Sequence, residues 1–368
     1  MKGNVIVGLS GGVDSAVAAL LLKERGYQVT GVFMRNWEGQ GEACTVEDDH
    51  HEARLVAAEI GIPFYSFNFS DRYWDRVFER FLAEYKAGLT PNPDILCNKE
   101  IKFQAFLDRC VALDADLIAT GHYARIVNRS ELWKGVDASK DQSYFLYAVP
   151  GQALSRAVFP LGDLHKSEVR DIARSKGLPN FARKDSVGIC FVGQERFKSF
   201  LKQYLGDAAG DIVDPEGRVL GRHDGVMYHT IGQRKGLGVG GPGEPWFVVG
   251  KDVARKEVIA AQGADHPLLF APALLFSETC WVNGEPDWPF RGTAKIRYRQ
   301  SDQGVAIKGL GEGMYLAVFD EPQRAISPGQ SIVVYEGERC LGGGVIVKAC
   351  TRDGLSLTTV QGVRGGAT

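Results

Sequence analysis

The chain has 368 residues, more than the roughly 100 to 200 residues of an ordinary domain, so we expect two or three domains. Its 43 Lys and Arg nearly balance its 45 Asp and Glu, which means that any nucleic-acid partner must bind a local patch. No apolar run approaches the roughly 18 residues of a membrane span, and no signal-peptide core precedes the first strand, so we expect a cytoplasmic protein.

From residue 5 to about residue 178, apolar runs of strand length alternate with segments of helical period. This alternation is typical of an α/β domain built on a doubly wound parallel sheet. The predicted strands are VIVGL, QVTGVFM, PFYSFNF and ADLIATG, and the predicted helices cover residues 16–25, 47–60, 73–85 and 99–110.

The pattern changes after about residue 205. Residues 210–221 predict a hairpin around Asp214–Gly217, and residues 244–262 predict two strands around a turn. From residue 275 onward, short alternating strands separated by Gly and Pro predict a small closed β-barrel or a sandwich. We therefore expect a catalytic domain at residues 1–198, a small β-rich adaptor domain at 199–270 and a β-barrel at 271–368.

The string SGGVDS follows the first predicted strand directly. Gly11 and Gly12 permit positive φ and close backbone approach, so that N–H groups can converge on an anion at the positive end of the next helix. Ser10 and Ser15 add hydroxyl donors. This loop has neither the lysine of a Walker A loop nor a GxGxxG pattern. On SGG alone, a plain strand-to-helix turn and an anion-binding loop are equally good interpretations.

The complete string resembles the PP-loop of the ATP pyrophosphatases, which split ATP into AMP and pyrophosphate while adenylating a substrate oxygen. The resemblance implies that Asp14 helps to organise Mg²⁺. It also implies an ATP-binding segment made of Gly8, Leu9, Ser10, Gly11, Gly12, Val13, Asp14 and Ser15.

Two of the seven cysteines lie in segments suited to a reactive thiol, although the chain has no CxxC motif and no metal-type Cys/His spacing. In TPNPDILCNKEIKF we expect Asn98 to cap a helix beginning near Lys99, which places Cys97 at a helix N-terminus with Asp94 nearby. A small buried cysteine fits this segment equally well. Cys190, in ARKDSVGICFVG, combines a flexible backbone with local positive charge.

Eight blocks together resemble the MnmA family of tRNA-specific 2-thiouridylases over essentially the whole chain. The resemblance implies ATP-dependent adenylation of O2 of the wobble uridine in tRNAs for Lys, Glu and Gln. Sulfur transfer to C2 then gives 2-thiouridine, AMP and pyrophosphate. The blocks are SGGVDS, TPNPDILCNKEIKF, ATGHYAR, KDQSYFLY, KDSVGICF, MYHTIGQRKGLG, KIRYRQ and CLGGGVI.

The resemblance also implies a role for each catalytic residue. Cys190 would receive a persulfide from a sulfur-relay partner, which is a TusE-like protein or a cysteine desulfurase, and its terminal sulfur would attack C2. Cys97 would attack the persulfide, releasing hydrosulfide or the bound sulfur and leaving a Cys97–Cys190 disulfide. Asp94 would be the general acid/base. No metal cluster is expected.

Further positions match the family's ligand contacts, although each taken alone is better explained by packing, a turn, a helix cap or solvated charge. Met34 and Gly121 match ATP contacts. Asn92, Pro93 and Asp94 match the contact with the target base. Other tRNA contacts match His122, Lys140, Asp141, Gln142, Arg297, Tyr298 and Gln330.

The local basic patch is expected in GTAKIRYRQ. If this segment is a strand, Lys295, Arg297 and Arg299 share one face, which suits contact with a phosphate backbone. Two rival functions remain open: an ATP pyrophosphatase that transfers nitrogen to a small molecule, as GMP synthetase does, and a non-enzymatic tRNA-binding module. The first has no need for Cys97 and Cys190.

Overall fold

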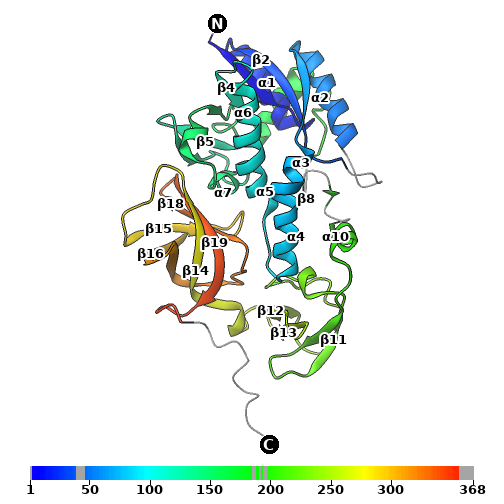
Figure 1. The fold of residues 1–368 in the computed structure, drawn as a ribbon, viewed down its shortest axis with the longest axis vertical. Helices are drawn as coiled ribbons and strands as arrows, with labels where there is room; N and C mark the ends of the chain where they lie inside the picture. Colours follow the sequence, from blue (N-terminus) through cyan, green and yellow to red (C-terminus); the bar gives the residue numbers. More distant parts are fainter. Residues whose placement is uncertain (1, 39–45, 185–187, 190–191, 194–196, 356–368) are drawn as a thin grey trace, which may run out of the picture.

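The computed structural model describes residues 2–38, 46–184, 188–189, 192–193 and 197–355 (Figure 1). Its amino-terminal part is a parallel sheet with the strand order β3-β2-β1-β4-β7, so the predicted doubly wound class is confirmed. The order reverses at β1, which lies between β2 and β4. The strands are β1 (Asn4–Gly8), β2 (Gln28–Arg35), β3 (Phe64–Asn68), β4 (Leu117–Ala119) and the unpredicted β7 (Ala157–Val158).

Alternating side chains of β1 divide the core into two clusters, one on each face of the sheet. Val5 and Val7 pack with α1 (Val13–Glu24) and α2 (Val46–Ile60). Ile6 packs on the other side with residues such as Phe106. Successive side chains of a strand point to opposite faces, so the apolar run of β1 is explained by burial on both sides.

Two long helical segments each contain a π-helical stretch. The first consists of α3 (Ser70–Tyr73), η1 (Trp74–Phe78) and α4 (Glu79–Lys86). Figure 1 shows it running from the sheet down beside the barrel, where Arg80 of α4 forms an ion pair with Glu278 at 2.6 Å. The second consists of α5 (Pro93–Leu96), η2 (Cys97–Ala105) and α6 (Phe106–Val111). Among the described helices, none is both long and apolar enough to cross a membrane.

The start of the second segment corrects the sequence prediction. The helix begins at Pro93, not near Lys99, because the Asn92 side chain accepts a hydrogen bond from the Asp94 N–H and Pro93 occupies the first turn. Asn98 is therefore not the N-cap, and Cys97 lies within the helix instead of at its N-terminus. The pair Asn92–Pro93, which precedes Asn98 in the sequence, is the stronger signal for the start of the helix.

The remaining elements of the amino-terminal part are short. They are β5 (Ala124–Val127), β6 (Glu131–Lys134), α7 (Ser143–Leu146), α8 (Gly151–Leu154), α9 (Lys166–Ser175), β8 (Gly188–Ile189) and β9 (Val192–Gly193).

The central part begins with α10 (Phe197–Leu205) and contains a sheet with the strand order β11-β10-β13-β12. Both predicted strand pairs are present and antiparallel. The elements are β10 (Gly210–Val213), β11 (Val219–His223), η4 (Val226–Tyr228), β12 (Trp246–Asp252), β13 (Glu257–Gln262) and η5 (Pro267–Leu269).

The carboxy-terminal part is a closed barrel, because β14 pairs with β17 on one side and with β19 on the other. This closure confirms the barrel and rules out the sandwich. The β5–β6 hairpin of the amino-terminal part continues the barrel sheet through pairing of β6 with β19. The barrel strands are β14 (Phe270–Trp281), β15 (Phe290–Lys295), β16 (Gln303–Gly311), β17 (Met314–Arg324), β18 (Ser331–Glu336) and β19 (Arg339–Cys350).

The predicted basic stripe in GTAKIRYRQ is wrong. Strand β15 ends at Lys295, and the chain then turns, with the Gln300 N–H bonded to the Arg297 carbonyl and Arg299 at a φ of 66°. The side chains of Lys295, Arg297 and Arg299 therefore do not share one face of a strand. Lys295 turns toward Asp141, and Arg297 toward backbone carbonyls.

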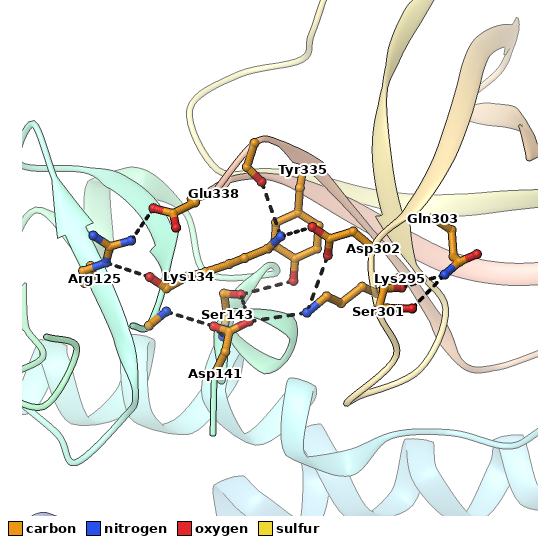
Figure 2. A network of polar contacts seen from close by, with 12 residues as sticks. Arg125, Lys134, Asp141, Ser143, Lys295, Ser301, Asp302, Gln303, Tyr335 and Glu338 are labelled. Atoms are coloured by element: carbon orange, nitrogen blue, oxygen red, sulfur yellow. Dashed lines mark hydrogen bonds and ion pairs between the residues drawn. The ribbon is translucent and has the colours of Figure 1, made fainter. Parts of the chain in front are cut away.

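A polar network joins the hairpin to the barrel (Figure 2). The Asp141 carboxylate, 4% exposed, accepts hydrogen bonds from the Gly135 N–H, the Ser143 N–H and the Ser143 hydroxyl, and it faces Lys295 at 3.7 Å. Asp302 of the barrel contacts both Lys295 and Lys134 of β6. Buried charges are tolerated only when paired and hydrogen-bonded, so this network fixes one relative placement of the two parts.

We predict that Asp141→Ala lowers the free energy of unfolding by about 3–5 kcal/mol, because it removes one of the two carboxylates that face Lys295 and leaves the Gly135 and Ser143 N–H groups without their acceptor. Denaturant unfolding measures the loss. Asp320→Ala is the matched control, since Asp320 forms a solvent-exposed barrel ion pair with Arg291 and should cost at most about 1 kcal/mol. Equal losses in the two variants would contradict a special contribution from the buried network.

Candidate functional site

The PP-loop segment lies at the carboxyl end of β1, at the point where the strand order reverses, which is where open α/β sheets bind ligands. The loop is held by its own hydroxyls: Ser15 Oγ donates to the Gly12 carbonyl at 3.1 Å and accepts from the Ser10 N–H at 3.1 Å. No side chain caps the start of α1 at Gly12. The helix N-terminus therefore suits an anion, and the binding of ATP by this loop stays a prediction.

Gly11 is required in this loop for two reasons. Its φ is 78°, and a Cβ there would lie 2.5 Å from the Asp49 carbonyl oxygen. Its own carbonyl accepts hydrogen bonds from Asn180 Nδ2 at 2.9 Å and Arg183 Nη1 at 3.2 Å. Arg183 also bonds to the Asp49 carboxylate, so the loop is fixed against both α2 and the segment that follows α9.

The two predicted ATP contacts outside the loop flank it. A Cβ on Gly8 would lie 2.8 Å from Met34 Cε, which places Met34 of β2 against the end of β1. A Cβ on Gly121 would lie 2.7 Å from the Asp14 carbonyl carbon and from the Ser15 nitrogen. The structure thus brings the ends of β1, β2 and β4 together around the first turn of α1.

Lys166 is a residue of this site that the sequence analysis missed. Its Nζ lies 2.6 Å from Asp14 Oδ1, which also accepts a 2.7 Å hydrogen bond from the Tyr123 hydroxyl. The Lys166 side chain is only 11% exposed, and its N–H is bonded to Asp137. The sequence did contain a signal for this role. A lysine in the first turn of a helix opposes the helix dipole, so the lysine at the start of α9 calls for a functional explanation.

Asp14 fits a role in holding Mg²⁺, since a carboxylate oxygen beside an anion-binding loop is the kind of ligand that Mg²⁺ prefers. Within the described residues, no three His, Cys, Asp or Glu side chains come together in a way that would hold a metal ion by themselves. A magnesium ion here would accordingly be shared with phosphate oxygens.

Cys97 is 2% exposed and belongs to the same hydrophobic cluster as Leu9 and Val13 of the PP-loop. The thiol is thus buried in the core cluster to which the PP-loop also contributes. Its predicted partner Cys190 lies outside the described residues, so the meeting of the two thiols stays a prediction. Cys44 lies outside them as well.

Asp94 lies three residues before Cys97 on the same helical segment. Burial raises the pKa of the Asp94 carboxyl above its ordinary value of 3.8, and the charge of Lys102 opposes this rise. Lys102 also acts on His122: burial first, then Lys102, lowers the pKa of His122 well below 6.5. The charge of Lys102 thus acts on both Asp94 and His122.

The His122 ring is buried, and its lowered pKa favours the neutral form. Its Nδ1 lies 2.7 Å from Thr120 Oγ1, and its ring packs against Phe103 and Phe159. A neutral imidazole interacts with RNA through hydrogen bonds and not as a cation. The tRNA contact of His122 stays a prediction.

The other predicted tRNA contacts gather where the barrel meets the amino-terminal part. Gln142 accepts a 3.0 Å hydrogen bond from the Tyr123 N–H, and Tyr298 packs on Phe145 with ring centroids 4.4 Å apart. Gln330 Nε2 donates to the Thr90 carbonyl at 2.6 Å, next to Asn92. Lys140 and Asp141 belong to the same seam. None of these contacts with tRNA is tested by the structure.

Arg297 is aimed into the protein. Its Nη2 donates to the Ala325 carbonyl at 2.7 Å and to the Ile231 carbonyl at 3.2 Å. Burial and the neighbouring Arg324 lower the pKa of Arg297. The guanidinium thus links the barrel to the central part, and its tRNA contact also stays a prediction.

Three family models match the chain in succession. Residues 3–194 match the tRNA methyl transferase HUP domain, residues 198–262 the tRNA methyl transferase PRC-barrel domain, and residues 272–346 the aminomethyltransferase beta-barrel domain. The tRNA-specific 2-thiouridylase MnmA of Pseudomonas paraeruginosa (strain PA7) is 59% identical over 94% of both chains. The chain belongs to the MnmA family of tRNA-specific 2-thiouridylases.

Other relatives with the same name are similar over the same length. The enzyme of Pseudomonas fluorescens (strain Pf0-1) is 58% identical over 94% of this chain and 95% of its own. That of Stutzerimonas stutzeri (strain A1501) is 57% identical over 95% of each. The family resemblance found in the sequence is thus confirmed over nearly the whole chain.

We predict that Asp94→Asn stabilises the fold in a pH-dependent way while it reduces activity. Below the carboxyl's ordinary pKa, Asp94 is protonated in the folded and unfolded states, so the substitution should change little. As the pH rises, the unfolded chain ionises freely while the folded state resists ionisation, so the asparagine variant gains stability. Thermal unfolding between pH 4 and pH 8 measures the gain.

Activity of Asp94→Asn should fall by about a hundredfold or more, because general acid–base catalysis contributes about 10²–10⁴-fold. Asp108→Asn, an exposed substitution on the same helical segment, is the control and should show neither effect. A pH-independent stability change in Asp94→Asn would be evidence against an unfavourably buried carboxylate.

Proposed function

We propose that this chain is a tRNA uridine 2-sulfurtransferase of the cytoplasm. It uses ATP to activate O2 of the wobble uridine in tRNAs for Lys, Glu and Gln, and then replaces that oxygen with sulfur. The observation that carries the proposal is the 59% identity over 94% of the chain to enzymes named tRNA-specific 2-thiouridylase. The matching domain models are described by methyl transfer. The relatives match at high identity over nearly the full length, and this favours their activity over methyl transfer.

The geometry at the carboxyl end of β1 supports the ATP step. The PP-loop and the start of α1 would hold the phosphates, and the approach of Gly121 to Asp14 leaves no room for a side chain between β4 and α1. Mg²⁺ held by Asp14 and the phosphates would spread the negative charge of the leaving pyrophosphate. Lys166, freed from Asp14, would supply a second positive charge at the same place.

The chemistry proceeds in three displacements. The uridine O2 attacks the α-phosphorus of ATP, which forms an O–P bond and expels pyrophosphate. The terminal sulfur of a Cys190 persulfide then attacks C2 and expels AMP, which carries the former uridine oxygen. Cys97 attacks Cys190 Sγ, breaks the S–S bond to the nucleobase sulfur, and leaves 2-thiouridine and a Cys97–Cys190 disulfide. In the alternative order Cys97 first releases hydrosulfide, which attacks C2 itself. Either route needs a thiol reductant to restore the enzyme.

Asp94 suits the proton transfers of this sequence. A carboxyl whose pKa is raised by burial exchanges protons more readily near neutral pH than an exposed one does. The persulfide would come from a protein donor, which is a TusE-like protein or a cysteine desulfurase. Substrate tRNA would cover the seam between the barrel and the amino-terminal part.

The decisive test incubates the protein with ATP, unmodified tRNA and a persulfide donor, and analyses the tRNA nucleosides by mass spectrometry. We expect 2-thiouridine together with AMP and pyrophosphate. Cys97→Ala and Cys190→Ala should abolish sulfur incorporation. Cys110→Ala should not, because burial raises the pKa of the Cys110 thiol to about 12 and keeps it protonated.

Each rival predicts a different outcome. A nitrogen-transferring ATP pyrophosphatase would release pyrophosphate and leave the nucleosides unchanged, with no dependence on either cysteine. A tRNA-binding module would bind tRNA and release no pyrophosphate. A methylated nucleoside would instead favour methyl transfer, the activity by which two of the matching domain models are described.

We further predict that Lys166→Met slows tRNA-dependent pyrophosphate release by about a hundredfold, the usual loss when one preorganised electrostatic contact to a transition state is removed. The matched control is Lys176→Met on the same helix, since Lys176 forms an exposed ion pair with Glu24. Pyrophosphate release by Lys166→Met within about twofold of wild type would rule out contact of Lys166 with the reacting phosphates.

A further inference from the structure

The loop that leads to Asn92 is held by the barrel. The Thr90 N–H donates to the Pro328 carbonyl at 2.9 Å, and the Thr90 carbonyl accepts from Gln330 Nε2 at 2.6 Å. Both backbone polar groups of Thr90 are thus bonded to the carboxy-terminal part, some 240 residues away in sequence. Asn92 and Asp94 follow directly, so the start of the active-site helix takes its position from the barrel.

The barrel loop that makes this contact is itself hydrogen-bonded to β19. The Gly329 N–H donates to the Ile346 carbonyl at 2.9 Å, and the Ile346 N–H donates to the Gln330 carbonyl at 2.7 Å. Gly329 has a φ of 88°, and a Cβ there would lie 2.8 Å from the Thr90 nitrogen. Only glycine permits this approach, so the loop and the Thr90 segment lie in direct backbone contact.

A second set of contacts joins the barrel to the same helical segment at Asn98. Ser331 follows Gln330, and it is bonded to two buried tyrosines: the Tyr144 hydroxyl donates to its carbonyl at 2.9 Å, and the Tyr147 hydroxyl lies 3.0 Å from its Oγ. Between these tyrosines, the Phe145 carbonyl accepts a 3.0 Å hydrogen bond from Asn98 Nδ2. Asn98 is buried and adjoins Cys97.

These two connections form a closed circuit of contacts, which we call the seam clamp. It consists of Gln330 and Ser331 of the barrel, the segment from Tyr144 to Tyr147 beside them, the backbone of Thr90, and Asn98. Along the chain, the segment from Asn92 to Asn98 lies between the two points of contact and ends at the second of them. We propose that Gln330 is a positioning residue, which through the seam clamp fixes Asp94 and Cys97 for the reaction. This inference rests on the proposed function and deepens it.

The physical reason is the strict geometry of the reaction. A displacement of about 1 Å at a reacting group can cost about 10²-fold in rate. Asp94 and Cys97 lie four and seven residues beyond Thr90, on one helical segment. A shift of Thr90 therefore moves both groups together relative to the PP-loop. The barrel consequently contributes to the chemical step as well as to binding.

The test compares Gln330→Ala with wild-type enzyme and with the control Gln262→Ala. Gln262 also donates an amide hydrogen bond to a backbone carbonyl, that of Pro242 at 2.8 Å, but both residues of this pair belong to the central part. For Gln330→Ala we expect kcat for 2-thiouridine formation to fall about tenfold or more, with KM for tRNA within about twofold of wild type. The control should match wild type in both.

A rise in KM for tRNA with kcat unchanged would overturn the proposal, since it would make Gln330 a direct tRNA contact. Unchanged kinetics would overturn it as well. Tyr147→Phe, which removes only the bond to Ser331 Oγ, provides a milder second variant. It should lower kcat in the same direction by a smaller factor.

A second measurement does not depend on the proposed function. In the free enzyme, the rate at which iodoacetamide alkylates Cys97 is followed by peptide mass spectrometry, with Cys110 as an internal reference. Both thiols are buried in wild type. Gln330→Ala should accelerate alkylation of Cys97 about tenfold relative to Cys110, because local opening and not global unfolding exposes it.

Equal acceleration at both cysteines would indicate general loosening and would overturn the clamp, as would no acceleration at all. A wild-type protein without thiolation activity would refute the proposed function instead. The alkylation rates would still decide whether Gln330 holds the Cys97 segment.

Discussion

The site depends on how closely the end of β4 approaches the first turn of α1. Gly121 touches the backbone of Asp14 and Ser15, so that strand, loop and helix form one packed unit. The same approach brings Tyr123 and Asp14 into hydrogen-bonding distance. Any side chain at position 121 would push α1 away, and the N-terminus of the helix would no longer face the space outside the sheet. The proposed binding of phosphate at this helix N-terminus thus depends on close backbone packing at Gly121.

Near this unit the protein holds two charged groups in positions that cost stability. Asp94 is a carboxyl in a desolvated position, and Lys166 is a cation at the N-terminal end of a helix, where the helix dipole opposes it. Cys97 is buried as well, which is usual for a cysteine. Titratable groups with perturbed pKa values are common at functional sites, and this supports the role proposed for Asp94.

Much of this could be read from the sequence, because local patterns specify local structure. The apolar run of β1 and the glycines at 11 and 12 predicted the sheet and the loop, and the strand spacing after residue 275 predicted the barrel. The errors have tertiary causes. Asn98 looked like a helix cap, but its amide bonds to Phe145, and Asn92 takes the capping role. Lys295 and Arg297 looked like a surface stripe, yet partners distant in sequence draw them inward.

The sharing of one sheet by two parts of the chain limits how tRNA recognition can act. β6 extends the barrel through β19, Asp141 and Lys295 join across the seam, and Thr90 is bonded to the barrel loop. A large rotation of the barrel would break all three contacts and expose buried charge, which costs several kcal/mol. If tRNA binds at the seam as proposed, its binding can therefore reach Asp94 only as a small displacement within a packed interface. Under that proposal, the contacts that place the tRNA and the contacts that place Asp94 belong to one interface.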